Sequence, residues 1–384
     1  MAIEDIQLSA SGAPLEEREQ VAIATPRQLM WWKFRKHRVA LVSVVILIIF
    51  YLLGMIFPEF ISHVDPNGVN ASWKNVPPQS ISFIDAEGNF SLRPGVYGLN
   101  TVRDPETLRR SYEVDTSVWH PLYFFTPGRP YRLWGIFESD IHLFGLGPDA
   151  DPRAVYFPLG TDRLGRDMFS RIITGGRISL SIGLVSVFLS LILGVILGGI
   201  SGYYGGQVDN VIQRVIEFIR SIPSIPLWMG LSAALPPEWP LEWRYFGITI
   251  ILSAIGWTGL ARQVRGRFLA LRTEDFVLAA RLGGASDRRI ILRHMVPSFT
   301  SHLIASLTLS IPGIILAETA LSFLGLGLKQ PIISWGVLLQ EAQNVRTVAL
   351  APWLLIPGLA VVISVLAFNF LGDGLRDAAD PFSR

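Results

Sequence analysis

Few side chains in this 384-residue sequence are of the types that perform catalysis or bind metal ions. There is no Cys, and none of the six His residues begins the His-Glu-x-x-His spacing of a zinc protease. The Gly-x-Ser-x-Gly turn of a serine hydrolase is also absent. None of the four lysines follows a Gly, so the sequence has no Walker A loop to hold ATP phosphates. These absences argue against an enzyme, and any energy from ATP must be supplied by another chain.

One ionisable residue, Glu318, lies well inside an apolar segment. Carrying a bare charge to the centre of a bilayer costs at least about 2.5 to 3.5 kcal/mol, so such a residue is a candidate functional site. Two interpretations are open. Glu318 could line a translocation pathway and meet a substrate amine, or it could be buried, protonated or paired, at an interface between membrane subunits.

The composition around these residues indicates a membrane protein. Half of the residues are hydrophobic and 17% are charged, and the net charge of +2 is too balanced to indicate nucleic-acid binding. The first apolar run, Val39–Phe57, has no charged residue and is long enough to cross a hydrocarbon core of about 30 Å as a helix. Five further apolar segments follow it: Ile178–Ile200, Ile219–Leu235, Phe246–Leu260, Phe299–Leu326 and Trp353–Leu371.

Positive charges predict the orientation of these six spans. Lys and Arg precede the first span beside Trp31 and Trp32, and eight Arg residues fill the loop between the fourth and fifth spans. Such loops stay in the cytoplasm, which places both termini there. A cleavable signal is disfavoured by the roughly 38 preceding residues and by the lack of a small-residue cleavage site. The run Gly194–Gly202 suits close helix packing. Prolines within the spans predict kinked helices: Pro223, Pro226, Pro312 and Pro357.

The segment between the first two spans, 58–158, should lie on the extracytoplasmic side of the membrane. It combines many Pro and Gly residues with aromatic residues such as Trp73, Trp119 and Trp134, which is too much aromatic surface for a disordered linker. We expect a small folded cap whose surface docks an external binding protein or covers the outer mouth of a pathway.

The segment Arg272–Ser298 predicts a helix, a glycine corner and a second helix. Thr273 can cap a helix that Gly283 and Gly284 stop, and Ser286 can cap a second helix starting at Asp287. The second helix has one apolar stripe, formed by Ile290, Ile291 and Met295. Small residues around the corner would let another protein approach closely. An amphipathic hairpin lying on the bilayer is the alternative.

This segment resembles the EAA motif of ATP-binding-cassette importer permeases, which runs Glu-Ala-Ala, three residues, Gly, nine residues and Ile-x-Leu-Pro. Four residues occupy matching positions: Ala279, Ala280, Gly284 and Pro297. Leu278 stands in place of the motif's glutamate, while His294 and Val296 stand at its Ile and Leu positions.

Further segments resemble the C-type subunit of the dipeptide and oligopeptide permease family. They are WWKFRKHRVALVSVVIL, FPLGTDRLGRDMFSRIITGGRISL, SGYYGGQVD, GWTGLARQVR, LAETALSFLGLG and LGDGLRDAADP. They cover nearly the whole chain except the external insert, which is longer than the family's members lead us to expect.

The resemblance implies an all-α membrane protein with six transmembrane helices, a cytoplasmic coupling loop and an extracytoplasmic insert. The corresponding division is a cytoplasmic N-terminal tail 1–38, a first transmembrane helix 39–57, an insert 58–158, a permease core 159–372 with the coupling loop 272–298, and a cytoplasmic C-terminal tail 373–384. The resemblance further implies that the chain is a multi-pass protein of the bacterial inner membrane.

The resemblance also implies the partners. They are a second, homologous permease, two ATP-binding subunits that use ATP and Mg, an extracytoplasmic substrate-binding protein and membrane lipid, with no cofactor or metal bound by this chain. ATPase coupling is expected at six residues: Ala279, Ala280, Gly284, Ala285, Ser286 and Asp287. Because the family has a glutamate at the position of Glu318 whatever its substrate, we favour the subunit interface for that residue.

Peptides are the expected cargo. The alternative is that the same machinery imports oligosaccharides, opine-like compounds or nickel chelates, as some relatives do. A self-contained channel or ion-coupled carrier belongs to a different class. It would usually show a selectivity-filter signature or inverted repeats, and neither is evident.

Overall fold

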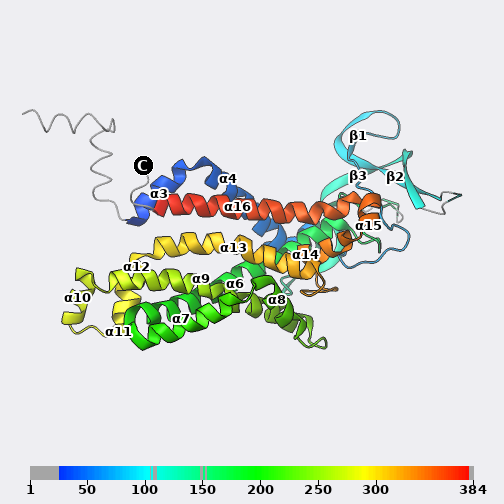
Figure 1. Ribbon diagram of the computed structural model, residues 1–384. Coiled ribbons are helices and arrows are strands. Elements are labelled where there is room, and N and C mark those ends of the chain that lie inside the picture. Colours follow the sequence, from blue (N-terminus) through cyan, green and yellow to red (C-terminus); the bar gives the residue numbers. More distant parts are fainter. Residues whose placement is uncertain (1–25, 104, 107–109, 148–149, 152–153, 380–384) are drawn as a thin grey trace, which may run out of the picture.

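The computed structural model describes residues 26–103, 105–106, 110–147, 150–151 and 154–379. Within them, long helices lie side by side in an elongated body, and an antiparallel sheet stands at one end of it (Figure 1). The predicted tails 1–38 and 373–384 are described only over 26–38 and 373–379, and their other residues lie outside the described part. The described part of the C-terminal tail continues the last helix.

The helical elements fall into two groups along the chain. Before the sheet lie α3 (Pro26–Lys36), α4 (Arg38–Tyr51), the π-helical η1 (Leu52–Ile56) and α5 (Pro58–Ile61). After it lie α6 (Met168–Tyr204), α7 (Gly206–Ser221), α8 (Ser224–Ala233), α9 (Leu241–Leu271), α10 (Asp275–Leu282), α11 (Asp287–Arg289), the π-helical η2 (Ile290–Met295), α12 (Val296–Ser298), α13 (Thr300–Phe323), α14 (Trp335–Leu339), the 3-10 helix η3 (Gln340–Gln343), α15 (Val345–Leu350), the 3-10 helix η4 (Pro352–Leu355) and α16 (Ile356–Ala379).

Five of the predicted spans are confirmed as helices. Within the described residues, five helical segments are long and apolar enough to cross a membrane: Arg38–Ile56, Met168–Tyr204, Leu241–Leu271, Thr300–Phe323 and Pro352–Ala379. The helices α6 and α9 extend past both ends of the apolar segments that predicted them. A helix needs no lipid to continue, because its backbone hydrogen bonds are internal.

The predicted third span, Ile219–Leu235, is not one helix. The chain leaves the helical conformation between α7 and α8, where Ile222 has φ −92° and ψ 129°. A residue before a proline is pushed toward extended backbone, and Pro223 has no N–H to donate. The α8 helix has only 10 residues. Pro357, by contrast, stands in the first turn of α16, where a proline is tolerated.

The pair α7 and α8 nevertheless leads from one end of the body to the other (Figure 1). At the start of α7, Asp209 pairs with Arg265 near the end of α9, and their Oδ1 and Nε atoms lie 2.5 Å apart. Midway, Ile216 packs against Trp257. Near the end of α8, the Ser232 hydroxyl donates a hydrogen bond to the carbonyl of Leu326, just after α13. The segment therefore starts at the end that carries α10 and finishes at the end that carries the sheet.

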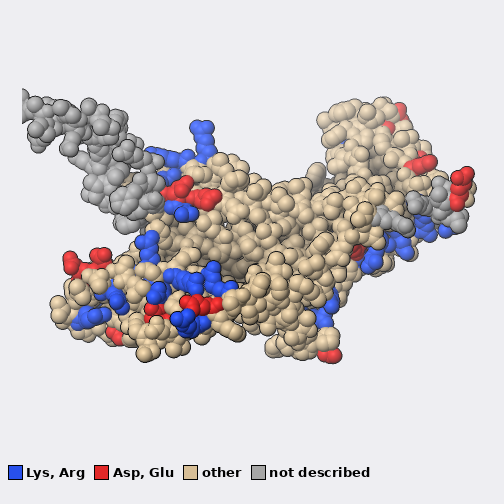
Figure 2. Space-filling view, in the orientation of Figure 1, with Lys and Arg blue, Asp and Glu red and all other residues tan. Residues whose placement is uncertain are grey.

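Charged side chains on the visible face gather at the two ends of the body (Figure 2). The surface between these ends is largely free of charge in this view, as a lipid-facing belt requires. The end formed by α3, α10 and α11 includes the Arg-rich segment between α9 and α13. We refer to it as the inner end and to the sheet end as the outer end.

A row of glycines brings α6 against α9. Gly194, Gly198 and Gly202 face α9, and a Cβ placed on Gly202 would lie 2.6 Å from the Cβ of Phe268 and 2.7 Å from the carbonyl oxygen of Arg265. No side chain fits at that distance, so the expectation of close packing for Gly194–Gly202 is confirmed. Without a hydrophobic driving force in lipid, such close contact supplies the dispersion energy that holds membrane helices together.

A buried ion cluster fixes the outer end of α6. The guanidinium of Arg166 donates to the Asp162 carboxylate at 2.6 Å and to the Glu341 carboxylate at 2.9 Å. Arg171 lies beside them, with its Nε atom 3.7 Å from Asp162. Burial raises the pKa of Glu341, and the nearby Asp162 carboxylate adds to this effect, while Arg166 opposes it. The cluster ties the segment before α6 to the segment after α14.

The insert is a sheet, so the expectation of an all-α protein is wrong there. Its antiparallel strands follow one another in the order β1 (Ser82–Ile84), β2 (Phe90–Arg103), β3 (Arg110–Leu133) and β4 (Phe137–Leu146). The first half of β3 pairs with β2, up to Pro121 opposite Gly95, and the second half pairs with β4, from Leu122 opposite Leu146. Aromatic and β-branched residues, which favour strands, are frequent in this stretch.

The close contact of Gly194, Gly198 and Gly202 with α9 leads to a prediction for the substitution Gly202→Ala. Alanine normally stabilises a helix by about 1 kcal/mol relative to glycine, yet the new Cβ would overlap Phe268 and the α9 backbone. We expect a net loss of about 1 to 3 kcal/mol, typical of overpacking, seen as a lower melting temperature of the purified protein.

Gly313→Ala is the matched control, because Gly313 lies in the long helix α13 with nothing within 4 Å of its Cβ position. Equal melting temperatures for Gly202→Ala and Gly313→Ala would contradict the packing argument.

Candidate functional site

The predicted helix and glycine corner lie at the inner end. The first helix starts later than expected: Glu274, with φ −72° and ψ 146°, is the N-cap of α10, and Asp275 is its first residue. Thr273 does not cap the helix, because its hydroxyl donates to the carbonyl of Ala270 at the end of α9 instead. The second boundary is confirmed, since Ser286 occupies the N-cap position of α11 and Asp287 begins it.

The corner itself has the geometry that a C-terminal glycine allows. Gly284 has φ +74°, in the left-handed region that glycine adopts without steric cost. The Ala285 N–H donates to the Ala280 carbonyl at 3.0 Å, and the Gly284 N–H donates to the Arg281 carbonyl at 3.0 Å. This pair of hydrogen bonds is the Schellman motif, which satisfies the last carbonyls of α10. A Cβ at Gly284 would meet no atom within 4 Å, so the corner faces open space.

The apolar stripe after the corner is also confirmed. Ile290 and Met295 are fully buried, and they pack with Val277 of α10 and with Phe268 of α9. The Arg side chains of the same segment lie on its exposed side. The corner is therefore seated on the inner ends of the long helices by its own hydrophobic contacts.

Two tyrosines that the sequence analysis did not single out hold Asp287. The Tyr203 hydroxyl donates to Oδ1 of Asp287 at 2.7 Å, and the Tyr204 hydroxyl donates to Oδ2 at 3.2 Å. Arg281 lies over the Tyr203 ring, with its guanidinium carbon 5.6 Å from the ring centre. The last two residues of α6 thus hold Asp287, the first residue of α11, by hydrogen bonds. The adjacent tyrosines before Gly205 were visible in the sequence, but their partner 84 residues away was not.

The six residues expected to couple to an ATPase divide into two groups. Ala279, Gly284, Ser286 and Asp287 are exposed, whereas Ala280 and Ala285 are half-buried and pack against the hydrophobic cluster below the corner. The exposed group is joined by Leu282, whose side chain is 90% exposed, and by Leu278, at the position of the motif's glutamate. An exposed apolar surface of this kind typically marks a contact with another protein.

Glu318 lies inside the chain and not on its surface. It is 0% exposed, and its carboxyl group accepts hydrogen bonds from Ser322 and Ser334 at 2.8 Å and from Ser179 of α6 at 3.3 Å. The Ser179 hydroxyl in turn accepts the backbone N–H of Trp335. These contacts join α6, α13 and the start of α14. Contact with cargo or with a second subunit would require this carboxyl group to be uncovered, so both roles remain predictions.

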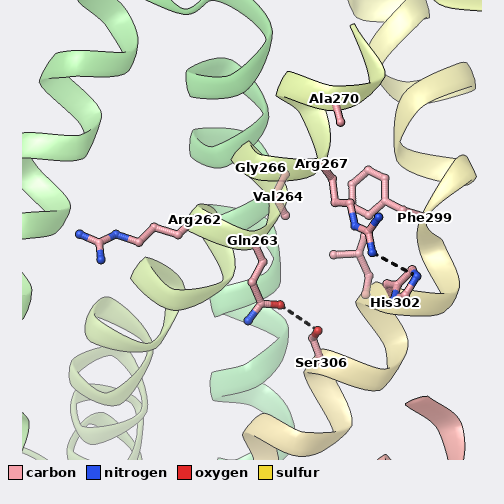
Figure 3. Close-up of a pocket in the computed structure, with 10 residues that line it drawn as sticks. Arg262, Gln263, Val264, Gly266, Arg267, Ala270, Phe299, His302 and Ser306 are labelled. Atoms are coloured by element: carbon pink, nitrogen blue, oxygen red, sulfur yellow. Dashed lines mark hydrogen bonds between the residues drawn. The ribbon is translucent and has the colours of Figure 1, made fainter. Parts of the chain in front are cut away.

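A polar hollow lies between α9 and α13 near the inner end (Figure 3). It is an open cavity of about 470 Å³. Within it, the Ser306 hydroxyl donates to the Gln263 side chain at 2.8 Å, and Arg267 lies 3.3 Å from His302, whereas Arg262 points away from these pairs (Figure 3). The sequence analysis did not identify this hollow, although the spacing of four between His302 and Ser306 places both side chains on one face of a helix.

Two family models match the chain. Residues 190–384 match the binding-protein-dependent transport system inner membrane component, and residues 25–78 match the N-terminal transmembrane domain of oligopeptide transport permease C. Among the described residues, no group of His, Cys, Asp and Glu is arranged to hold a metal ion.

Curated relatives agree with these matches. The chain is 42% identical over 248 residues to the oligopeptide transport system permease protein OppC of Haemophilus influenzae, covering 64% of this chain and 76% of that protein. It is 42% identical over 254 residues to OppC of Salmonella typhimurium, covering 65% of this chain and 79% of the relative. A solved chain of the MetNI methionine ABC transporter matches 55% of this chain and 97% of its own length, with 19% identity and a TM-score of 0.42, and supports no further argument.

The helical body and the matches to these family models and relatives define the class of this protein. It is a multi-pass permease of the inner membrane and is not itself an enzyme. The chain belongs to the family of binding-protein-dependent transport system inner membrane components, as a permease of the OppC type.

The hydrogen bonds from Ser179, Ser322 and Ser334 to Glu318 lead to a prediction for substitutions of this residue. Glu318→Gln keeps an acceptor for the Ser322 and Ser334 hydroxyls, whereas Glu318→Leu leaves them buried without it. We expect Gln to cost about 1 kcal/mol or less and Leu about 1 to 3 kcal/mol for each unsatisfied hydroxyl. Melting temperature and protease resistance of the segment 325–343 measure this difference.

A pathway role would give a different result from this structural one. It would appear as an altered KM for uptake in Glu318→Gln with an unchanged melting temperature.

Proposed function

We propose that this chain forms half of the translocation pathway of an ATP-binding-cassette importer for oligopeptides. The relatives' names supply the cargo class. The observation that carries the mechanism is the corner at Gly284, an open and rigidly seated surface at the inner end. A surface that must transmit force needs both properties: a partner must reach it, and it must not deform.

In this proposal two ATPase subunits dock at the inner end and use ATP and Mg, which this chain does not bind. Ala279, Gly284, Ser286 and Asp287 supply the exposed contact, and Ala280 and Ala285 support it from below. Closure of the ATPases moves the corner. The hydrogen bonds from Tyr203 and Tyr204 to Asp287 transmit this movement to α6. Rigid-body rocking of packed helices then alternates access between the two sides of the membrane.

A second, homologous permease completes the pathway, and an external binding protein delivers cargo at the sheet end. We propose that the hollow between α9 and α13 lines the inner part of this pathway. Gln263, Ser306 and His302 have side chains that could exchange their present hydrogen bonds for bonds to peptide N–H and C=O groups. A neighbouring cavity of about 430 Å³ shares these residues and reaches Arg376 of α16, which extends the polar surface.

We further propose that α7 and α8 together make a sixth crossing, with both termini in the cytoplasm. Five crossings would leave the start of α3 and the end of α16 on opposite sides of the membrane. The run of α7 and α8 from inner to outer end supplies the missing passage.

Coupling can be tested at Gly284 with the assembled transporter in liposomes. Gly284→Trp should lower ATP-driven peptide uptake at least about tenfold, equivalent to about 1.4 kcal/mol, because the indole fills the docking surface. Gly284→Ala should lower uptake less than Gly284→Trp, because its methyl group occupies little of the docking surface. The cost of a positive φ for a non-glycine residue, about 1 to 2 kcal/mol, lowers folding stability and is common to both variants.

Gly88→Trp is the matched control, since Gly88 also has positive φ and open surroundings but lies in the turn between β1 and β2, at the opposite end of the body. Normal uptake by an assembled Gly284→Trp transporter would contradict the coupling role. ATP-dependent uptake of sugars or metal chelates but not peptides would keep the mechanism and change the cargo, and uptake driven by an ion gradient without ATPases would refute the importer.

The sixth crossing can be tested with single cysteines, because the chain has none of its own. In intact cells, a membrane-impermeant maleimide should label Glu238→Cys, between α8 and α9, and should not label Gln207→Cys, at the start of α7. Gly88→Cys and Arg288→Cys give the outer and inner references. Labelling of Glu238→Cys only after permeabilisation would show that α7 and α8 return to the inner side.

A further inference from the structure

The second half of β3 and β4 form a hairpin that packs on the end of the first span. Its strands pair from Leu122 opposite Leu146 to Leu133 opposite Phe137. The short helix α5, which directly follows the first span, contacts both strands. Phe60 of α5 and Phe125 of β3 lie with their ring centres 6.1 Å apart. The hairpin is thus fixed to the outer end of a membrane helix.

A single hydrogen bond sets the depth of the hairpin tip. The indole N–H of Trp134, in the turn between β3 and β4, donates to the carbonyl oxygen of Ile56 at 2.9 Å. Ile56 is the last residue of η1, where the segment Arg38–Ile56 ends. The tip therefore lies at the level at which the first span leaves the membrane.

An ion pair marks the same level independently. Arg177 of α6 pairs with Glu59 of α5, and its Nε atom also donates to the carbonyl of Met55 at 3.3 Å. Both charged side chains are partly exposed. A partly exposed ion pair belongs at the membrane–water interface and not in the hydrocarbon core, so the boundary lies near residues 55–59.

The tip exposes large apolar side chains at this level. Ile136 is 72% exposed, Phe137 59% and Trp134 52%. The one polar atom of the Trp134 side chain is already bonded to Ile56, so its ring can leave water without losing a hydrogen bond. Arg132 and Glu138, which pair with each other just above the tip, are exposed and charged. Aromatic residues below charged ones are the pattern of an interfacial anchor.

We propose that the β3–β4 tip inserts into the outer interfacial layer of the bilayer beside the first span. The occupant of this apolar surface is lipid, because the bond from Trp134 to Ile56 places the tip at the end of the first span, where lipid headgroups lie. The remainder of the sheet stays above the membrane. This inference does not depend on the cargo or on the coupling mechanism.

The test uses the full transporter in phosphatidylcholine nanodiscs, with a nitroxide on Ile136→Cys. The probe should relax more with oxygen, which enriches in lipid, than with a water-soluble nickel chelate. Val42→Cys, exposed within the first span, gives the lipid reference, and Gly88→Cys, in the turn between β1 and β2, gives the water reference. An intermediate or lipid-like value at Ile136 supports the anchor.

A water-like value equal to that of Gly88→Cys would overturn the proposal. So would a probe shielded from the chelate only after the binding protein is added, which would assign the tip to protein docking. Phe137→Cys carrying the same probe repeats the measurement on the other side of the turn, so a local disturbance at Ile136 does not decide the result.

Discussion

The close approach of α6 to α9 is the contact on which the rest of the structure depends. Gly194, Gly198 and Gly202 leave no room for side chains between the two helices. Once they touch, hydroxyl groups of α6 reach the α9 backbone: Ser186 donates to the Thr249 carbonyl and Ser190 to the Ser253 carbonyl, both at 3.2 Å. In lipid, polar groups that find partners inside the protein hold helices in one register, because no water competes for them.

Three buried or partly buried polar contacts are arranged along the same helix, α6. Its outer end begins in the ion cluster around Asp162 and Arg166, its middle supplies Ser179 to Glu318, and its inner end supplies Tyr203 and Tyr204 to Asp287. Each of these contacts joins α6 to a segment that is distant in sequence. The carboxyl group of Glu318 joins polar groups of α6, α13 and the start of α14.

Sequence patterns predicted what depends on neighbouring residues. The lengths of the apolar segments predicted five spans that the structure confirms, and Gly283 and Gly284 predicted the end of α10 at the corner. The third span was predicted as one helix with a kink at Pro223, and the structure instead has two helices separated there. Pairings over long separations left no local signal: the tyrosines that hold Asp287, the serines around Glu318 and the strand register of the insert. The roles assigned to the corner and to Glu318 remain predictions.

The unbroken length of α6 has a mechanical consequence. Its 37 residues form one rod of about 55 Å that is gripped at one tip by the corner and embedded at the other in the ion cluster. A stiff rod converts rotation into displacement in proportion to its length, so a tilt of about 5° at the inner tip moves the outer tip by about 5 Å for a rod of this length. If the corner moves as proposed above, α6 tilts as one piece, and its outer tip carries the buried ion cluster and the segments bound to it along.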